Sequence, residues 1–218
     1  MKFIVASDIH CHFDETLEKI HNLIEENPDI DGILLAGDFT NTGSESEQDK
    51  FLDFISNIEV ITAPPICFVT GNHERSIHHE DMQLRLYNVT DNRSLIYIER
   101  KTFILQGFNL SPCFEAPQLA LEYERMTPYR DFDLGYYTLS RKADIILSHC
   151  PPAGLELSKC NWKGGKLDIG SPGLREYIEK HQPLLVVCGH VHEGGGMTEY
   201  IGKTKVVNTA TKVMIVEL

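Results

Sequence analysis

The sequence predicts an α/β fold in a single domain, residues 1–218, and three observations support that prediction. Short apolar runs alternate with amphipathic segments between residues 2 and 70, in the order strand, helix, strand, helix, strand. This spacing implies right-handed crossovers and a mainly parallel sheet. A chain of 218 residues can bury well over half of its unfolded surface. Its 42% hydrophobic and 24% charged content is typical of a globular protein.

The first third of the chain is expected to contain three buried strands and two helices. The strands are the apolar runs Lys2–Ala6, Gly32–Ala36 and Ile66–Thr70. Residues 14–26 repeat apolar side chains at helical spacing, with Asp14 as the expected N-cap and Pro28 just beyond the end. A second amphipathic helix is expected over residues 45–58.

The rest of the chain is expected to mix antiparallel pairs with further buried strands. The expected elements are a hairpin of residues 94–98 and 102–106, strands at 143–147 and 184–188 with a helix over 172–180 between them, and an antiparallel meander of residues 197–201, 204–207 and 212–217. Pro172 suits the first position of that helix. Residues 111–142 are aromatic-rich and irregular, and they predict either a lid or a dimer contact.

Charge and composition argue against several classes of partner. The net charge of -12 argues against nucleic acid, because a protein that binds it needs positive charge to displace phosphate counterions. No apolar stretch approaches the roughly 20 residues of a membrane span. The apolar start, residues 1–7, is too short for a signal peptide. None of the six cysteines forms a C-x-x-C pair, which fits a reducing compartment. We therefore expect a cytoplasmic protein without a membrane partner.

Five short motifs, each directly after an expected strand, carry oxygen or imidazole ligands for metal. They are Asp8-Ile9-His10, Gly37-Asp38, Gly71-Asn72-His73-Glu74, Ser148-His149 and Gly189-His190-Val191-His192. Ligands in open α/β sheets gather at the carboxyl ends of the strands, so we expect the five motifs to meet there. Such ligands can hold two transition-metal ions, a common device for splitting phosphate esters.

The spacing inside the motifs predicts their local geometry. Asp8 and His10 are two residues apart in what should be an extended strand exit, so both side chains should reach one metal. His190 and His192 are expected to repeat that geometry. The glycine that precedes the second and third motifs allows unusual backbone angles and a close approach of the backbone to the site.

Taken in order, the motifs D-x-H, G-D, G-N-H-[DE], a lone His and G-H-x-H resemble the signature of the calcineurin-like metallophosphoesterase superfamily. Finer features resemble its metallophosphoesterase-domain (MPPED) subfamily: Gly37-Asp38-Phe39-Thr40, Gly71-Asn72-His73-Glu74, His149-Cys150-Pro151-Pro152 and His192-Glu193-Gly194. Many superfamily members carry Asn-Pro-Gly near the C-terminus, where this chain has Asn208-Thr209-Ala210. The resemblance implies a sandwich of two mixed β-sheets flanked by helices.

The resemblance also implies a role for each motif residue. The first metal would be held by Asp8, His10 and His192, and the second by Asn72, His149 and His190. Asp38 would bridge the two ions, and His73 would act on the substrate as general acid or charge stabiliser without binding metal. The mixed nitrogen and oxygen ligands suit Mn, Fe, Ni, Co or Zn, with Mn favoured, better than Mg or Ca.

These features predict a phosphodiesterase that hydrolyses small phosphodiesters, nucleotides among them, with a metal-bridging hydroxide as nucleophile. A phosphomonoesterase and a protein Ser/Thr phosphatase are enzymatic alternatives. A metal-binding scaffold of the same fold is the non-enzymatic alternative, and the presence of His73 with every ligand argues against it.

Further residues near the motifs carry two interpretations each. Cys11 and Cys150 are soft metal ligands or small apolar side chains. Carboxylates next to ligands orient imidazoles or cap turns: Glu74 and Glu193. Basic side chains contact substrate phosphate or are solvated: Arg75, Lys163 and Lys166. Aromatic side chains stack on a base or cover the core: Tyr129 and Trp162.

Overall fold

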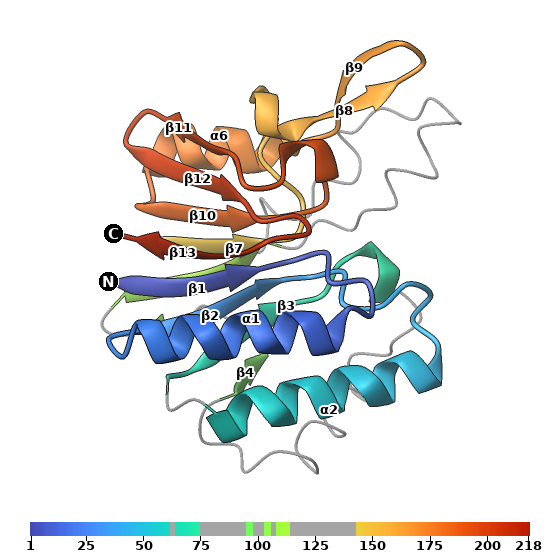
Figure 1. Cartoon of the computed structure of the whole chain (residues 1–218). Coiled ribbons are helices and arrows are strands. Elements are labelled where there is room, and N and C mark those ends of the chain that lie inside the picture. Colours follow the sequence, from blue (N-terminus) through green and yellow to red (C-terminus); the bar gives the residue numbers. More distant parts are fainter. Residues whose placement is uncertain (62–63, 75–94, 98–102, 106–107, 114–142) are drawn as a thin grey trace.

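The computed structural model describes residues 1–61, 64–74, 95–97, 103–105, 108–113 and 143–218, which form two mixed β-sheets packed face to face between helices (Figure 1). The first sheet contains, in spatial order, β13 (Val213–Glu217), β1 (Lys2–Ala6), β2 (Gly32–Ala36), β3 (Ile66–Val69) and β4 (Leu95–Tyr97). The second contains β11 (Thr198–Ile201), β12 (Thr204–Asn208), β10 (Leu185–Cys188), β7 (Ile145–Ser148), β6 (Phe108–Cys113) and β5 (Phe103–Leu105). This is the sandwich that the resemblance implies.

Three apolar layers hold the sandwich together. Helices α1 (Phe13–Glu26) and α2 (Glu45–Ile61) cover the outer face of the first sheet, and α6 (Pro172–His181) covers that of the second. In β1, Phe3 and Val5 face the second sheet, whereas Ile4 faces the helices. Both faces of the strand are buried, which explains why the central strands read as continuous apolar runs.

The helix ends follow local capping chemistry, with one correction to the sequence prediction. Ser171 caps α6, since its side chain accepts a hydrogen bond from the Leu174 amide at 2.9 Å, and Pro172 takes the first helical position as expected. Asp14 is not the N-cap of α1. The helix begins at Phe13 with His12 as N-cap and no side-chain cap bond, so Asp14 lies in the first turn, where its charge favours the helix N-terminus.

The central strands run parallel, and this positions the site. Within the first sheet β1, β2, β3 and β4 are parallel neighbours, as are β6, β7, β10 and β12 in the second. The parallel strands of the two sheets run in the same direction in Figure 1, so their carboxyl ends lie on the same side of the molecule. The motifs that follow β1, β2, β3, β7 and β10 are thus brought to one edge of the sandwich.

Two strand pairings differ from the prediction. Residues 94–98 and 102–106 do not form a hairpin, because β4 pairs with β3 in the first sheet and β5 pairs with β6 in the second. In the expected meander only β11 and β12 form an antiparallel pair, around Gly202 at φ 61°, while β13 pairs with β1. β4 and β13 each pair with a strand distant in sequence, whereas β5 forms its antiparallel pair with β6, the next strand along the chain.

Some elements were not predicted. They are β6 and the separate hairpin of β8 (Lys159–Trp162) and β9 (Gly165–Asp168). Of the irregular segment at 111–142, residues 111–113 end β6 and the remainder lies outside the described residues. No helix in the described ranges combines the length and the hydropathy that a membrane crossing needs.

Candidate metal centre

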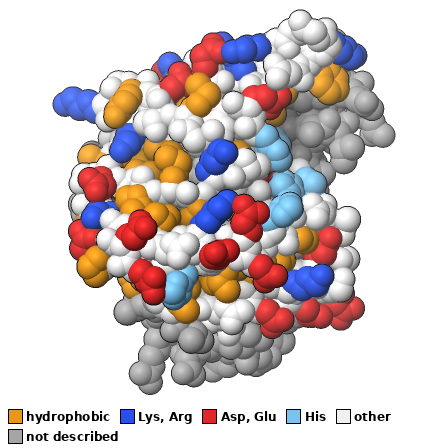
Figure 2. All heavy atoms as spheres, in the orientation of Figure 1, with side chains coloured by type: hydrophobic (Ala, Val, Ile, Leu, Met, Phe, Trp, Pro, Cys, Tyr) orange, Lys and Arg blue, Asp and Glu red, His pale blue; other side chains and the backbone are white. Residues whose placement is uncertain are grey.

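Side chains from all five motifs meet at the carboxyl edge of the two sheets. Figure 2 shows most histidine side chains of this face gathered in one patch. Three overlapping groups of potential ligands lie there, and within each group the ligand atoms are within 4.8 Å of one another. The groups are Asp8, His10 and His192; His10, Asp38 and His73; and Asp38, His149 and His190.

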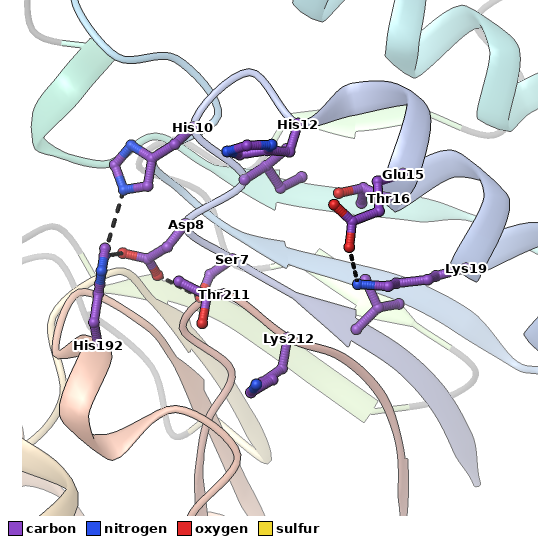
Figure 3. A pocket seen from close by; sticks show the side chains of 12 residues that line it. Ser7, Asp8, His10, His12, Glu15, Thr16, Lys19, His192, Thr211 and Lys212 are labelled. Atoms are coloured by element: carbon purple, nitrogen blue, oxygen red, sulfur yellow. Dashed lines mark hydrogen bonds and ion pairs between the residues drawn. The ribbon is translucent and has the colours of Figure 1, made fainter.

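The first cluster is Asp8, His10 and His192, which joins the end of β1 to the end of β10. The His192 Nε2 lies 3.1 Å from the Asp8 Oδ1 and 3.4 Å from the His10 Nε2, so three ligand atoms face a common point (Figure 3). The His10 Nδ1 is 3.3 Å from the Thr40 carbonyl, which accepts its proton and leaves the Nε2 lone pair directed into the cluster.

The second cluster is Asp38, His149 and His190, with Asn72 beside it. The His149 Nε2 lies 3.1 Å from both the Asp38 Oδ2 and the Asn72 Oδ1. Its Nδ1 donates to the Ala36 carbonyl at 2.8 Å, which fixes the ring orientation. The His190 Nε2 is buried and has no hydrogen-bond partner among the described residues. An unpartnered imidazole nitrogen among carboxylate, amide and imidazole ligands fits a transition-metal ion.

His73 lies at the exposed side of Asp38. The His73 amide donates to the Asp38 Oδ1 at 2.9 Å, and its Nε2 is 3.8 Å from the Asp38 Oδ2. The His73 Nδ1 donates to the Asn41 carbonyl, so the Nε2 faces the site. Its side chain is 36% exposed, whereas that of Asp38 is 3% exposed. His73 can therefore meet a molecule arriving from solvent, and Asp38 connects it to His149 of the second cluster.

The backbone around these ligands is not extended, which corrects the geometry predicted from spacing. Asp8, His10, Asp38 and His190 have φ values of 52°, 47°, 55° and 70°. These are left-handed conformations that non-glycine residues rarely adopt and that cluster at functional sites. His190 and His192 also differ from the expectation of one shared metal. His190 is left-handed and His192 begins a 3₁₀ turn, so this stretch is not an extended strand, and the two rings lie in different clusters.

Glu74 holds the ends of β2 and β3 together through backbone groups and the Thr40 hydroxyl, and not through the ligand atoms of either cluster. Its carboxylate is 2% exposed and accepts four hydrogen bonds. They come from the Asp38 amide at 2.9 Å, the Thr40 amide at 2.9 Å, the Thr40 hydroxyl at 2.8 Å and the Gly71 amide at 2.8 Å. Glu74 therefore positions the backbone beside Asp38 and Asn72 rather than orienting an imidazole.

A second buried network, which sequence reasoning did not identify, supports Asp8 and His192. The Ser7 hydroxyl donates to the Asp8 Oδ2 at 2.6 Å, and the Thr209 hydroxyl lies 2.9 Å from that of Ser7. Asn208 donates from its Nδ2 to the carbonyls of Leu157 at 3.0 Å and Val191 at 2.9 Å. The only sequence signal was the position of Asn208-Thr209-Ala210, where the family carries Asn-Pro-Gly.

Burial and charge set the protonation of the second cluster. Burial by itself lowers the pKa of His149, but the charge of Asp38 outweighs it and raises the pKa to about 10. Burial, together with the positive charge of His149, lowers the pKa of His190 to about 4. Burial tends to raise the pKa of Asp38, and the charge of His149 overcomes it and holds that pKa well below its usual range. A metal ion at this cluster must therefore displace a proton from His149.

The remaining candidates lie apart from the clusters or have partners elsewhere. Glu193 accepts a hydrogen bond from the Asn161 amide at 2.8 Å and so ties β8 to the turn that carries His192. Cys150 is buried with its Sγ 3.5 Å from the carbonyls of Pro151 and Ile169, and Cys11 is half-buried outside the clusters. Two of the basic and aromatic candidates, Arg75 and Tyr129, lie outside the described residues.

The other three residues of that group lie on or beside the β8–β9 hairpin. The Lys166 Nζ pairs with Glu156 at 2.7 Å, and the Lys163 Nζ lies 5.4 Å from the centre of the Trp162 ring. Trp162 is 41% exposed. This placement gives Lys163, Lys166 and Trp162 no contact with the clusters. It therefore supports neither the contact with substrate phosphate nor the stacking on a base.

Comparisons with known proteins agree with the fold. A family model described as calcineurin-like phosphoesterase matches residues 1–194. The chain is 26% identical to metallophosphoesterase domain-containing protein 1 of Homo sapiens, over 96% of this chain and 65% of that protein. It is 21% identical to the probable glycerophosphodiester phosphodiesterase GpdQ of Arcobacter nitrofigilis, over 85% of this chain and 64% of that protein. It thus spans a little under two thirds of each relative.

A solved structure shows the same fold. The protein TT1561 of Thermus thermophilus superposes with a TM-score of 0.64 at 18% identity, over 96% of this chain and 88% of that protein. The human relative also confirms the resemblance to the MPPED subfamily. With nine tenths of its length matched by the family model, this chain belongs to the calcineurin-like phosphoesterase family, whose members are phosphoester hydrolases that generally bind two divalent metal ions.

Proposed function

We propose that this chain is a metal-dependent phosphodiesterase acting on small phosphodiesters. The observation that carries the proposal is the pair of adjoining ligand clusters, in which Asp38 of the second is also close to His10 of the first, with His73 beside Asp38 on the solvent side. In this proposal the first ion is held by Asp8, His10 and His192, and the second by Asn72, His149 and His190. Asp38 contributes to both.

The protein supplies positioning and proton transfer around the metals. Two divalent ions, when bound, contribute Lewis acidity toward phosphoryl oxygens and lower the pKa of water so that it can act as the nucleophile. Neutral imidazoles and the Asn72 amide add ligands without cancelling that positive charge. His73 in its charged form donates the Nε2 proton to the departing oxygen, because its Nδ1 is held by the Asn41 carbonyl.

Substrate class, metal and location complete the proposal. A diester substrate is supported by the relative from Arcobacter nitrofigilis, a probable glycerophosphodiester phosphodiesterase. The mixed nitrogen and oxygen ligands suit a transition-metal ion, and we propose Mn. We also propose that residues 1–218 form one domain, that the protein is cytoplasmic, and that it acts on a small molecule rather than on nucleic acid, in keeping with its net charge of -12.

The test is hydrolysis of bis-p-nitrophenyl phosphate, a diester, and p-nitrophenyl phosphate, a monoester, with Mn, Ni, Co, Zn or Mg. We expect metal-dependent hydrolysis with preference for the diester. His73→Ala should lower the rate about 10²–10⁴-fold while bound metal is unchanged. The matched control is His21→Ala, since His21 is an exposed histidine that pairs with Glu25 on α1.

Three results would contradict parts of this proposal. Preference for the monoester would reassign the chain as a phosphatase. Loss of metal in His73→Ala would make His73 a ligand rather than an acid. Absence of turnover with every metal, although two ions are bound, would favour a metal-binding scaffold.

A further inference from the structure

A pocket of about 360 Å³ opens directly beside the first ligand cluster. Asp8, His10 and His192 form one end of it, and it extends between the first turns of α1 and the chain that leads into β13 (Figure 3). Its volume lies within the range of sites for small ligands, about 300–1,000 Å³. The pocket is therefore continuous with the metal centre and large enough for one arm of a small ester.

Apart from the metal ligands, the charged side chains of this pocket sum to one positive charge. Away from the cluster, its charged side chains are Glu15, Lys19 and Lys212. The Lys19 Nζ is paired with the Glu15 Oε1 at 2.6 Å, whereas Lys212 makes no ion pair within the described part of the chain. Lys212 is exposed, and Figure 3 shows it on the β13 side of the pocket, across from Lys19. An uncompensated cation beside the metal centre is notable in a chain of net charge -12.

The proposed acid lies outside this pocket, because His73 is not among the residues that line it. His10 lines the pocket and is also next to His73: its ring centre is 4.8 Å from that of His73 and 5.3 Å from that of His192. The ester oxygen that departs must be near His73 to receive its proton. An arm in the pocket therefore belongs to the ester that stays on phosphorus.

We propose that this pocket binds the retained ester arm of a phosphodiester and that Lys212 selects arms bearing a second anionic group, a carboxylate or a phosphate. The inference rests on the proposed function and narrows its substrate class. In the reaction, a water molecule loses one proton to solvent, its oxygen forms a new P–O bond, and the P–O bond on the His73 side breaks. The departing alkoxide takes the proton of His73, and solvent then protonates His73 again. The products are an alcohol and a phosphomonoester that keeps the arm in the pocket.

This geometry gives a structural reason for preferring diesters. A monoester has no retained arm and would leave the pocket empty. Lys212 is then a specificity-determining residue, because its ammonium would meet the anionic end of the arm and not the reacting phosphorus.

Two matched substrates test the proposal on the metal-loaded protein: 4-nitrophenyl phenyl phosphate and its analogue with a carboxylate at the para position of the phenyl ring. Both release 4-nitrophenol and differ only in the charge of the retained arm. We expect kcat/KM about tenfold higher for the carboxylate substrate, mainly through KM, the factor that one partly desolvated ion pair supplies. Lys212→Ala should bring the ratio of the two kcat/KM values to about one, Lys212→Glu should invert it, and Lys212→Arg should preserve it.

The control is Lys203→Ala, since Lys203 is exposed in the turn between β11 and β12 and does not line the pocket. Its ratio should equal that of the unmodified protein. Equal kcat/KM for the two substrates, or a ratio that the Lys212 substitutions leave unchanged, would overturn this inference while hydrolysis of bis-p-nitrophenyl phosphate still supported the proposed function. Failure of that hydrolysis with every metal would overturn both.

Discussion

Glu74 is the residue whose role the structure defines most sharply. Burying a carboxylate is costly unless its oxygens are hydrogen-bonded, and each Glu74 oxygen accepts two bonds from the ends of β2 and β3. The sequence allowed two interpretations of this glutamate, orienting an imidazole or capping a turn. It could not decide between them, because the decisive partners, Asp38 and Thr40, are more than thirty residues away.

Glu74→Gln tests that role. One carboxylate oxygen becomes an amide that faces two donors, so buried hydrogen bonds are lost with no change in size. We expect the free energy of unfolding to fall by about 1–3 kcal/mol. Metal affinity should fall about 10–100-fold, because the backbone of Asp38 shifts. Urea denaturation and metal titration measure the two effects.

Glu193→Gln is the matched control, since Glu193 is exposed and accepts a single bond from the Asn161 amide. Its free energy of unfolding should change by less than about 0.5 kcal/mol. If Glu74→Gln behaved like this control in both measurements, the positioning role of Glu74 would be wrong.

At the scale of elements, the turns after the strands approach one another too closely for side chains. A Cβ built on Gly71 would lie 2.2 Å from the Asp38 Oδ1, and one built on Gly189 would lie 2.3 Å from the Asp8 Oδ2. Gly37 combines such contacts with a φ of 87°. The close backbone approach predicted for the glycines of the second and third motifs is thus confirmed, and it extends to the last motif.

Gly189→Ala should disrupt the turn after β10. The added methyl group would meet the buried side chains of Ser7 and Asp8, so the turn or Asp8 must move. We expect a loss of about 1–3 kcal/mol in the free energy of unfolding, together with weaker metal binding. Thermal unfolding and metal titration report both.

Gly165→Ala provides the comparison, because its nearest neighbour would be the Trp162 carbonyl at 3.9 Å. We expect stability to change by no more than about 0.5 kcal/mol. Full metal affinity in Gly189→Ala would show that the turn tolerates the methyl group and that its glycine is not needed for close approach.

Element positions were predictable and element partners were not. The strands β1 and β2 were predicted with their observed bounds, because continuous apolar runs between turn residues are a local signal. The placement of β13 depends on its pairing with β1, nearly the whole chain away. Its apolar residues at 213 and 215 contact the helix layer, and that at 216 contacts the inter-sheet layer, a pattern that an edge strand of either sheet could show.

At the scale of the whole molecule, each ligand cluster joins the two sheets. Asp8 and His10 follow β1 of the first sheet and meet His192 of the second, and Asp38 meets His149 and His190. Convergence of the motifs could be predicted because parallel strands end at one edge. The left-handed backbone at four of these residues could not, because only glycine announces such a conformation in a sequence.

Metal removal should therefore weaken the contact between the sheets. A ligand that binds only the folded state stabilises it by about 2.7 kcal/mol at a free concentration one hundred times its dissociation constant. For a chain of this size that corresponds to a rise of about 5–10 °C in Tm. We expect chelation to lower Tm by this amount and Mn to restore it. A substitution of His10, which follows the first sheet, should reduce this change in Tm, and so should a substitution of His190, which follows the second. An undiminished change in Tm in both variants would contradict this account.

The most direct test of the central claim is a titration of the chelated protein with Mn while hydrolysis of bis-p-nitrophenyl phosphate is followed. Two adjoining clusters, with Asp38 of the second also close to His10 of the first, predict that the rate rises until two metal ions are bound per chain and is constant thereafter. A rate that saturates at one ion, or that persists without metal, would contradict the two-metal phosphodiesterase.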